Sequence, residues 1–268
     1  MRQGGSERQA SLAMSLLARA RAVAAQPRAV HVRAPPIAAA GGLQFARRSS
    51  GGFDPAQAVN TADRSPEGAV QLYDAWAATY DETLREWGYE APEKIAELLA
   101  DHRSGSTIPL RAPVLDCGCG TGLSSEALSA NGFPTLYGVD VSHESLQLCE
   151  KKGLHTELKP CELDAEPLPF PDDTFSAVAC VGVLSYVQEF DHIFSEWCRT
   201  IVPGGLCAFT TRTWDADTHG IRSAAAALSE SGAWRLRHKS EPSAYMPLNP
   251  IPEENAKRIR YLVFEVLE

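Results

Sequence analysis

A glycine-rich turn constrains the fold of this chain more than any other feature of its sequence. Residues 114–122 read VLDCGCGTG, an apolar run that ends in Asp116 and continues through Gly118, Gly120 and Gly122. Glycine permits a tight turn, and its missing side chain lets a ligand lie against backbone N–H groups at a helix N-terminus. We therefore expect a strand, a turn and a helix, with a ligand that carries negative charge or a carboxylate at the turn.

Short apolar runs alternate with helix-like segments from this turn onward. Strands are predicted at residues 112–117, 134–141, 155–163, 175–183 and 204–212. Helices are predicted at 123–131, 143–152 and 188–201. Two extended C-terminal segments, 234–246 and 258–268, can pair as an antiparallel hairpin at the sheet edge. The pattern predicts an α/β fold with a doubly wound, mostly parallel, seven-stranded sheet.

Two helices are predicted before the first strand. Residues 66–87 carry one apolar and aromatic stripe, which includes Tyr73 and Tyr80 at helical spacing. Residues 91–102 form a second helix with Pro92 in its first turn. These boundaries divide the chain into a basic segment at 1–53, N-terminal helices at 54–111 and an α/β core at 112–268.

Charge is distributed unevenly between these parts. Residues 1–53 contain eight arginines, no lysine and a single acid, Glu7. Residues 54–268 contain 17 basic and 33 acidic residues, a formal charge of −16. A protein that neutralises phosphates needs a basic face, so a nucleic-acid partner is not expected. A small or cationic acceptor fits the acidic body better.

The first 53 residues have the composition of an organellar transit peptide. They are rich in Arg, Ala and Ser, and Arg19, Arg21 and Arg28 interrupt every apolar stretch. These interruptions argue against a secretory signal and against a membrane span. The dominance of arginine favours the mitochondrial matrix over a plastid. A basic tail on a cytoplasmic protein is the alternative.

Cysteine usage indicates reduced thiols. The seven cysteines are odd in number, scattered and often inside apolar runs. Cys117 and Cys119 form a CxC pair, but neither a second cysteine pair at zinc-ribbon spacing nor an HxxxH motif lies nearby. No metal site is expected.

The acids around the turn favour a sulfonium cofactor over a dinucleotide. Asp116 stands two residues before the first glycine of a GxGxG pattern, where a pyrophosphate would be repelled and a cationic sulfonium and amino group attracted. Asp140, eighteen residues after Gly122, can accept hydrogen bonds from both ribose hydroxyls. A helix cap is its alternative role, but Ser142 is the better N-cap candidate. Asp164 can accept from the adenine amine, or be an exposed loop acid.

Four motifs in this order resemble the class I S-adenosylmethionine-dependent methyltransferases: VLDCGCGTG, GVDVS, PLPFPDDTFSAV and VPGGLCAFTTR. The segments YDAWAATYD, GYEAP and TTRT most resemble the methyltransferase-like family of the Williams–Beuren syndrome chromosome region. Ser176 and Val202 depart from the usual Asp and Lys of relatives. The resemblance implies a Rossmann-like fold, S-adenosyl-L-methionine as cofactor, and a lid formed by the N-terminal helices.

The same resemblance distributes the cofactor contacts. Asp116, Gly118 and Gly120 would hold the methionine end, and residues 180–182 would line it. Asp140 would bind the ribose and Asp164 the adenine. The full set of expected cofactor contacts is Tyr73, Tyr80, Asp116, Gly118, Cys119, Gly120, Gly122, Asp140, Val141, Asp164, Ala165 and Val181.

Methyl transfer from a sulfonium needs alignment and exclusion of water, while a general base is optional. The candidates for acceptor contact are Tyr80, Tyr186, Arg212, Trp214 and His219. Ordinary packing or surface roles are the alternative for each. Two other functions stay open: a noncatalytic protein that binds the cofactor as a sensor or partner subunit, and an NAD(P)-dependent oxidoreductase. The latter would need GxGxxG and a YxxxK pair, which the chain lacks.

Overall fold

The computed structural model describes residues 53–61, 63, 65–103, 108–109, 111–212, 217 and 220–267. The predicted transit segment therefore lies outside the described residues, apart from Phe53, and so do Trp214 and His219.

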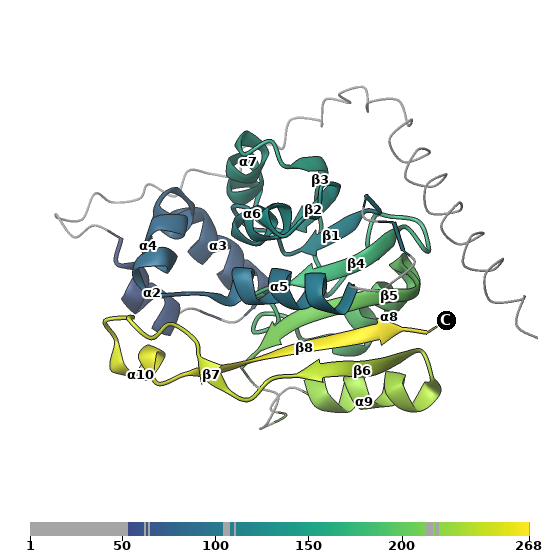
Figure 1. The fold of residues 1–268 in the computed structure, drawn as a ribbon. Helices are drawn as coiled ribbons and strands as arrows, with labels where there is room; N and C mark the ends of the chain where they lie inside the picture. Colours follow the sequence, from purple (N-terminus) through teal and green to yellow (C-terminus); the bar gives the residue numbers. More distant parts are fainter. Residues whose placement is uncertain are drawn as a thin grey trace, which may run out of the picture.

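A twisted central sheet carries the fold (Figure 1). Its strand order is β3-β2-β1-β4-β5-β8-β6, with the short β7 paired to β8. The five strands from β3 to β5 are parallel, whereas β8 runs antiparallel between β5 and β6. The strands are β1 Val114–Cys117, β2 Leu136–Asp140, β3 His155–Pro160, β4 Phe175–Cys180, β5 Ile201–Thr211, β6 Trp234–Lys239, β7 Ser243–Ala244 and β8 Arg258–Val266. The predicted doubly wound sheet and its antiparallel C-terminal pair are confirmed.

Helices cover both faces of this sheet (Figure 1). One face packs against α8 and α9, and the other against α5, α6 and α7. The helices of the core are α5 Ala91–Arg103, α6 Leu123–Ala130, α7 His143–Lys151, α8 Phe190–Thr200 and α9 Ile221–Ser231. The N-terminal layer contains α2 Pro55–Thr61, α3 Pro66–Trp76, η1 Ala77–Thr79 and α4 Tyr80–Glu86, and α10 spans Pro252–Asn255.

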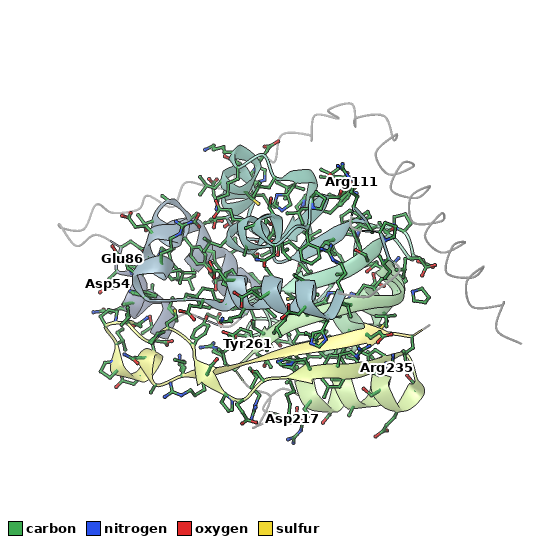
Figure 2. All side chains as sticks on the ribbon, viewed as in Figure 1. Asp54, Glu86, Arg111, Asp217, Arg235 and Tyr261 are labelled. Atoms are coloured by element: carbon green, nitrogen blue, oxygen red, sulfur yellow. The ribbon has the colours of Figure 1, made fainter. Side chains whose placement is uncertain are left out.

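Successive side chains of β4 point alternately to the two faces of the sheet. Val178 and Cys180 point into the cluster of α8 and α9, while Ala177 and Ala179 point toward α5 and α6. All four side chains are buried, as expected for a parallel strand covered on both faces. Side chains fill the space between the sheet and its helices (Figure 2).

Helix α8 shows how strongly this layer is packed. Phe194 and Trp197 are fully buried against the sheet. Burial of each side chain this size contributes roughly 1.5–3 kcal/mol or more. The apolar stripe predicted for residues 188–201 is therefore the face that binds α8 to the sheet.

Three sequence expectations need correction. The helix expected at 66–87 is broken by the 3-10 turn η1, where Thr79 leaves helical geometry. Ile201 begins β5 and pairs with Phe175 instead of ending α8, because one apolar residue satisfies either pattern. Helix α5 belongs to the core and not to a lid, since Ile95 and Leu99 are buried against the sheet. The layer over the site thus ends before Ala91.

Candidate active site

The site lies at the carboxyl ends of β1, β2 and β4. From β1 the chain adds β2 and β3 along one edge of the sheet, and it then returns to place β4 and β5 on the other side of β1. The direction of strand addition therefore reverses between β1 and β4. Ligands of open parallel sheets bind at such a switch point. Three adjoining hollows occupy this position.

The middle hollow has an empty volume of about 600 Å³ and joins the core to the N-terminal helices. Its neighbour toward β3 shares Gly118, Asp140 and Tyr186 with it. The third hollow, toward β5, shares Tyr73, Tyr80 and Gly182 with the middle one. We call these the cofactor hollow, the adenine-side hollow and the acceptor hollow.

The glycine turn bounds the cofactor hollow through its backbone. Gly118 and Gly120 have φ angles of 78° and 51°, in the left-handed region that favours glycine. A Cβ on Gly118 would lie 2.3 Å from Val183, so a side chain is excluded by packing. A Cβ on Gly120 would meet nothing within 4 Å, because this residue faces the open hollow. A ligand can therefore approach the backbone at Gly120.

The N–H groups of this turn, however, are bonded within the chain. Gly118 and Cys119 donate to the carbonyl of Val139, at 2.8 and 2.9 Å. Gly120 donates to Asp140 Oδ2 at 2.8 Å. The expectation that these amides face a negatively charged ligand group is wrong at these positions. The glycines provide space, while their N–H groups hold the turn to β2.

Asp140 occupies the place where the cofactor hollow and the adenine-side hollow meet. Its two oxygens accept 2.8 Å hydrogen bonds from the N–H groups of Gly120 and Ser142. Burial raises the pKa of Asp140 to about 6. Ser142 caps α7 by accepting from the N–H of Ser145, as predicted. Each carboxylate oxygen has more than one lone pair, so Asp140 can still accept from a diol in the hollow.

Asp116 lies beneath the turn. Its carboxylate accepts hydrogen bonds from the hydroxyls of Ser124, at 2.7 Å, and Ser125. The side chain is fully buried, burial raises its pKa, and it does not line the hollow. Its Oδ1 has no hydrogen-bond partner among the described residues. The structure thus shows Asp116 supporting the first turn of α6, and its contact with the cofactor stays a prediction.

Asp164 lines the adenine-side hollow. Its carboxylate accepts from the backbone N–H groups of Gln188, at 2.9 Å, and Glu189, at 3.0 Å. These bonds join the loop after β3 to the segment before α8. Ala165 donates its N–H to Glu162 and does not line the hollow. Contact between Asp164 and adenine stays a prediction.

The predicted cofactor contacts divide into two groups. Those that line the cofactor or adenine-side hollow are Tyr73, Tyr80, Gly118, Gly120, Asp140, Val141, Asp164 and Val181. Those that lie outside both are Asp116, Cys119, Gly122 and Ala165. Cys119 points instead into a buried cluster with Leu146 and Cys149.

Several lining residues were not predicted from the sequence. Thr121 and Ser145 follow predicted site residues closely, and Val183 follows Val181. The alternation of side chains after β4 could have indicated Val183. Ala69 comes from α3, and only the folded arrangement of that helix places it at the hollow.

Aromatic side chains of the N-terminal layer cover the hollow. Tyr73 makes edge contacts with Tyr80 and Tyr186, at ring-centre distances of 5.7 and 5.6 Å. Burial raises the pKa of Tyr73 and of Tyr80 well above its ordinary value. Both phenols are therefore protonated at neutral pH.

Three polar contacts fasten this layer to the core. Ser142 donates its hydroxyl to Asp74 at 2.5 Å. Thr121 donates to Asp81 at 2.5 Å, and Lys152 pairs with the other oxygen of Asp81 at 2.7 Å. The helices that carry Tyr73 and Tyr80 are thereby tied to the glycine turn and to α7.

The acceptor hollow contains three of the predicted acceptor residues, Tyr80, Tyr186 and Arg212. Arg212 donates to Ser185 Oγ through Nε, at 3.3 Å, and through Nη2, at 3.0 Å. The remaining lining residues are Val59, Tyr73, Trp76, Leu84, Gly182, Ser185, Tyr245 and Met246.

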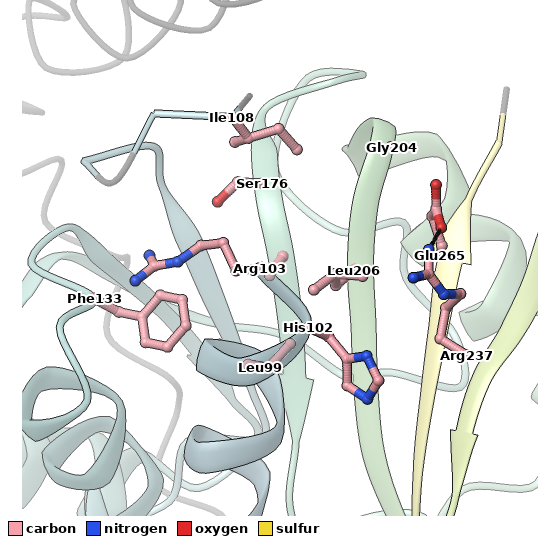
Figure 3. Close-up of a pocket in the computed structure, with 11 residues that line it drawn as sticks. Leu99, His102, Arg103, Ile108, Phe133, Ser176, Gly204, Leu206, Arg237 and Glu265 are labelled. Carbon is pink, nitrogen blue, oxygen red and sulfur yellow. Dashed lines mark hydrogen bonds and ion pairs between the residues drawn. The ribbon is translucent and has the colours of Figure 1, made fainter. Parts of the chain in front are cut away.

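A further hollow lies at the opposite end of the sheet (Figure 3). There, Arg237 pairs with Glu265, and the guanidinium of Arg103 lies 4.0 Å from the ring centre of Phe133. No predicted cofactor or acceptor residue lines this hollow. The functional site is therefore placed at the carboxyl ends of the strands.

No group of three or more metal-ligating side chains occurs among the described residues. Within the described ranges, no helix has both the length and the apolar character needed to cross a bilayer.

The residues present fit the expected cofactor. Gly120 leaves open space beside the backbone, and Asp140 offers carboxylate lone pairs at the entrance to the adenine-side hollow. The adenine-side hollow has apolar walls that include Val141, Leu163 and Val187, as a flat heterocycle requires.

Solved structures share this architecture. A methyltransferase of Haloferax volcanii, in complex with the Trm112 methyltransferase activator, superposes with a TM-score of 0.55 at 16% identity, over 73% of this chain and 96% of that one. A TehB-like S-adenosylmethionine-dependent methyltransferase of Corynebacterium glutamicum superposes with a TM-score of 0.51 at 17% identity, over 72% and 98%. At these identities the likeness shows the fold, which is the Rossmann-like fold of class I methyltransferases.

Sequence similarity shows the family to which the chain belongs. A family model described as a methyltransferase domain matches residues 115–209. Human methyltransferase-like protein 27 is 36% identical over 181 residues, which cover 66% of this chain and 73% of the human one. The chain belongs to the methyltransferase family that includes this human protein, and its cofactor is S-adenosylmethionine.

More distant relatives match only in part. A fatty-acid O-methyltransferase of Mycolicibacterium smegmatis is 33% identical over 98 residues, or 36% of either chain. A phosphatidylethanolamine N-methyltransferase of Cereibacter sphaeroides is 38% identical over 96 residues, 34% of this chain and 46% of that one. The chain spans less than half the length of these two relatives.

Proposed function

We propose that this protein transfers the methyl group of S-adenosylmethionine to a small-molecule acceptor. The observation that carries this proposal is the continuity of the cofactor hollow with the acceptor hollow through Tyr73, Tyr80, Gly182 and Tyr186. An acceptor in the second hollow would lie next to the methionine end of the first. Direct displacement needs such an alignment.

The names of the relatives support an organic acceptor. Two of them are a fatty-acid O-methyltransferase and a phosphatidylethanolamine N-methyltransferase. The acidic body of this chain, with a charge of −16 over residues 54–268, is unsuited to nucleic acid. Five aromatic side chains line the acceptor hollow, those of Tyr73, Trp76, Tyr80, Tyr186 and Tyr245, and such side chains suit contact with the apolar part of a small organic molecule.

Each group of residues has a distinct task in this proposal. S-adenosylmethionine supplies the activated methyl group. Asp140 would accept hydrogen bonds from the ribose, and Asp164 would lie at the adenine edge. Tyr73, Tyr80 and Tyr186 would exclude water and orient the acceptor, because displacement at a sulfonium competes with hydrolysis in an open site.

The test is methyl incorporation from labelled S-adenosylmethionine into a small-molecule extract, with S-adenosylhomocysteine measured in parallel. We expect product formation by the wild-type chain and strong loss in Asp140→Asn. Cofactor binding without transfer to any fraction would favour the noncatalytic alternative. Binding of NAD in place of S-adenosylmethionine would favour an oxidoreductase. No finding in the fold, site or relatives supports either alternative.

We also propose that residues 1–53 direct the protein to mitochondria, on the basis of their eight arginines and single acid. A fusion of these residues to a fluorescent protein should accumulate in mitochondria. Plastid import or a diffuse cytosolic signal would contradict the proposal.

A further inference from the structure

Arg212 stands at the carboxyl end of β5, where the acceptor hollow begins. Its guanidinium donates twice to Ser185 Oγ and lies 5.1 Å from the ring centre of Tyr245. The loop that carries Gly182 is fixed beside it, because the N–H of Gly182 donates to Thr210 Oγ1 at 2.8 Å. Arg212 is therefore held next to a residue shared with the cofactor hollow.

The charge of Arg212 has no partner of opposite sign in the described part of the chain. No described carboxylate lies within ion-pair distance of it, although it is half-buried. Arg199, by contrast, is half-buried and pairs with both Glu196 and Asp172. A half-buried cation among aromatic rings is stabilised when an anion joins it. A guanidinium also matches the planar geometry of a carboxylate.

Among the described residues that line the acceptor hollow, none is an evident catalyst for proton removal from an acceptor. The described lining of the hollow contains neither a carboxylate nor a histidine. A phenol has an ordinary pKa of about 10, and burial raises the pKa of Tyr73 and Tyr80 further. A neutral alcohol or an ammonium group would need a base here, whereas a carboxylic acid is already ionised at neutral pH.

We propose, building on the function above, that the methyl acceptor is a small organic acid whose carboxylate is bound by Arg212 and becomes the methyl ester. A carboxylate oxygen donates an electron pair to the methyl carbon and forms the C–O bond. The C–S bond breaks, its electron pair stays on sulfur, and S-adenosylhomocysteine is released. No proton moves in this step. The apolar part of the acid packs against Trp76, Leu84 and Met246.

The experiment compares acids with neutral molecules of the same shape. Phenylacetate and octanoate, their amides and the corresponding alcohols are titrated into the full chain saturated with S-adenosylhomocysteine. Labelled methyl transfer is then measured with mild alkaline hydrolysis, which releases methanol from methyl esters. We expect binding and ester formation for the acids alone.

Three variants test the role of Arg212. Arg212→Gln should weaken acid binding by about tenfold or more, the loss expected for a charged hydrogen-bonding partner, and should leave S-adenosylhomocysteine affinity unchanged. Arg212→Lys should retain part of the acid binding. The control, Arg235→Gln, changes an arginine on the edge strand β6 and should behave as wild type.

Distinct outcomes separate this inference from the proposed function. Retained cofactor binding with amides or alcohols methylated as well as acids would overturn the acid assignment and leave methyl transfer intact. Failure of every acid to bind, or normal acid methylation by Arg212→Gln, would likewise overturn it. Loss of methylation in His219→Ala with normal acid binding would contradict a step without a base. Failure to bind S-adenosylhomocysteine would refute the proposed function itself.

Discussion

The backbone N–H of Gly120 donates to the carboxylate of Asp140 at 2.8 Å, which ties the glycine turn after β1 to the end of β2. The residue expected to bind ribose therefore also holds the turn that makes room for the ligand. Ser142 donates to the second oxygen of the same carboxylate. Binding and local structure are coupled through one side chain.

Asp140→Asn should weaken S-adenosylhomocysteine binding by about 1–3 kcal/mol, because an amide cannot accept at both oxygen positions. Calorimetric titration measures this affinity, and thermal unfolding shows whether the fold survives. Asp101→Asn, an exposed acid on α5, serves as the matched control and should bind normally. Equal affinities for the two variants would remove Asp140 from the ribose site.

Cofactor affinity should depend on pH through Asp140. Without cofactor, Asp140 has a pKa of about 6. If the cofactor binds only the ionised carboxylate, Asp140 must release its proton when the cofactor binds below pH 6. Affinity should be constant above pH 7 and fall by up to about tenfold per unit below pH 6. Titrations between pH 5 and pH 8 measure this, and Asp140→Asn should lose the dependence. A flat profile in the wild type would contradict the assignment.

The same raised pKa affects stability with the opposite sign. An unfolded aspartate titrates at about 4, so the folded chain holds the proton more tightly than the unfolded one. Asp140 therefore favours folding below pH 4, and this contribution is lost as the pH rises through about 6. Between pH 4 and pH 6 the free energy of unfolding should therefore fall with rising pH, and it should fall less steeply in Asp140→Asn than in the wild type.

A pair of glycine variants separates packing from ligand access. Gly118→Ala should destabilise the fold, because its Cβ would lie 2.3 Å from Val183. Gly120→Ala meets no atom within 4 Å, so its stability cost is only the roughly 1 kcal/mol of a left-handed backbone, while its methyl group enters the cofactor hollow. Unfolding and cofactor titration together check this. A Gly120→Ala protein with unchanged affinity would place the cofactor elsewhere.

The ion pair of Asp81 with Lys152 should slow cofactor release. Asp81→Asn removes this pair but can still accept from Thr121, whereas Thr121→Val removes the hydrogen bond alone. Each change should raise the dissociation rate of S-adenosylhomocysteine by about threefold to tenfold, as expected for a loss near 1 kcal/mol. Stopped-flow tryptophan fluorescence reports the release, because Trp76 lines the acceptor hollow beside Tyr73 and Tyr80. Glu82→Gln, which changes an exposed neighbour, is the control. Dissociation rates equal to those of this control would show that the contacts of Asp81 do not restrain the N-terminal helices over the site.

The sequence predicted the parallel strands and the Ser142 cap because both depend on local pattern. Spacing alone could not distinguish whether Asp116 faces a ligand or the serine hydroxyls below it. The apolar stripe of α5 predicted that one face of this helix is buried. It could not show that this face packs against the sheet. The pairing of Asp81 with Lys152 joins residues 71 positions apart, and only the folded chain brings them together.

The most direct test of the central claim is calorimetric titration of the full chain with S-adenosylhomocysteine and, separately, with NAD. We predict saturable binding of S-adenosylhomocysteine at one site, weakened in Asp140→Asn, and no binding of NAD. Binding of NAD, or no binding of S-adenosylhomocysteine by a folded wild-type chain, would contradict the assignment of this site.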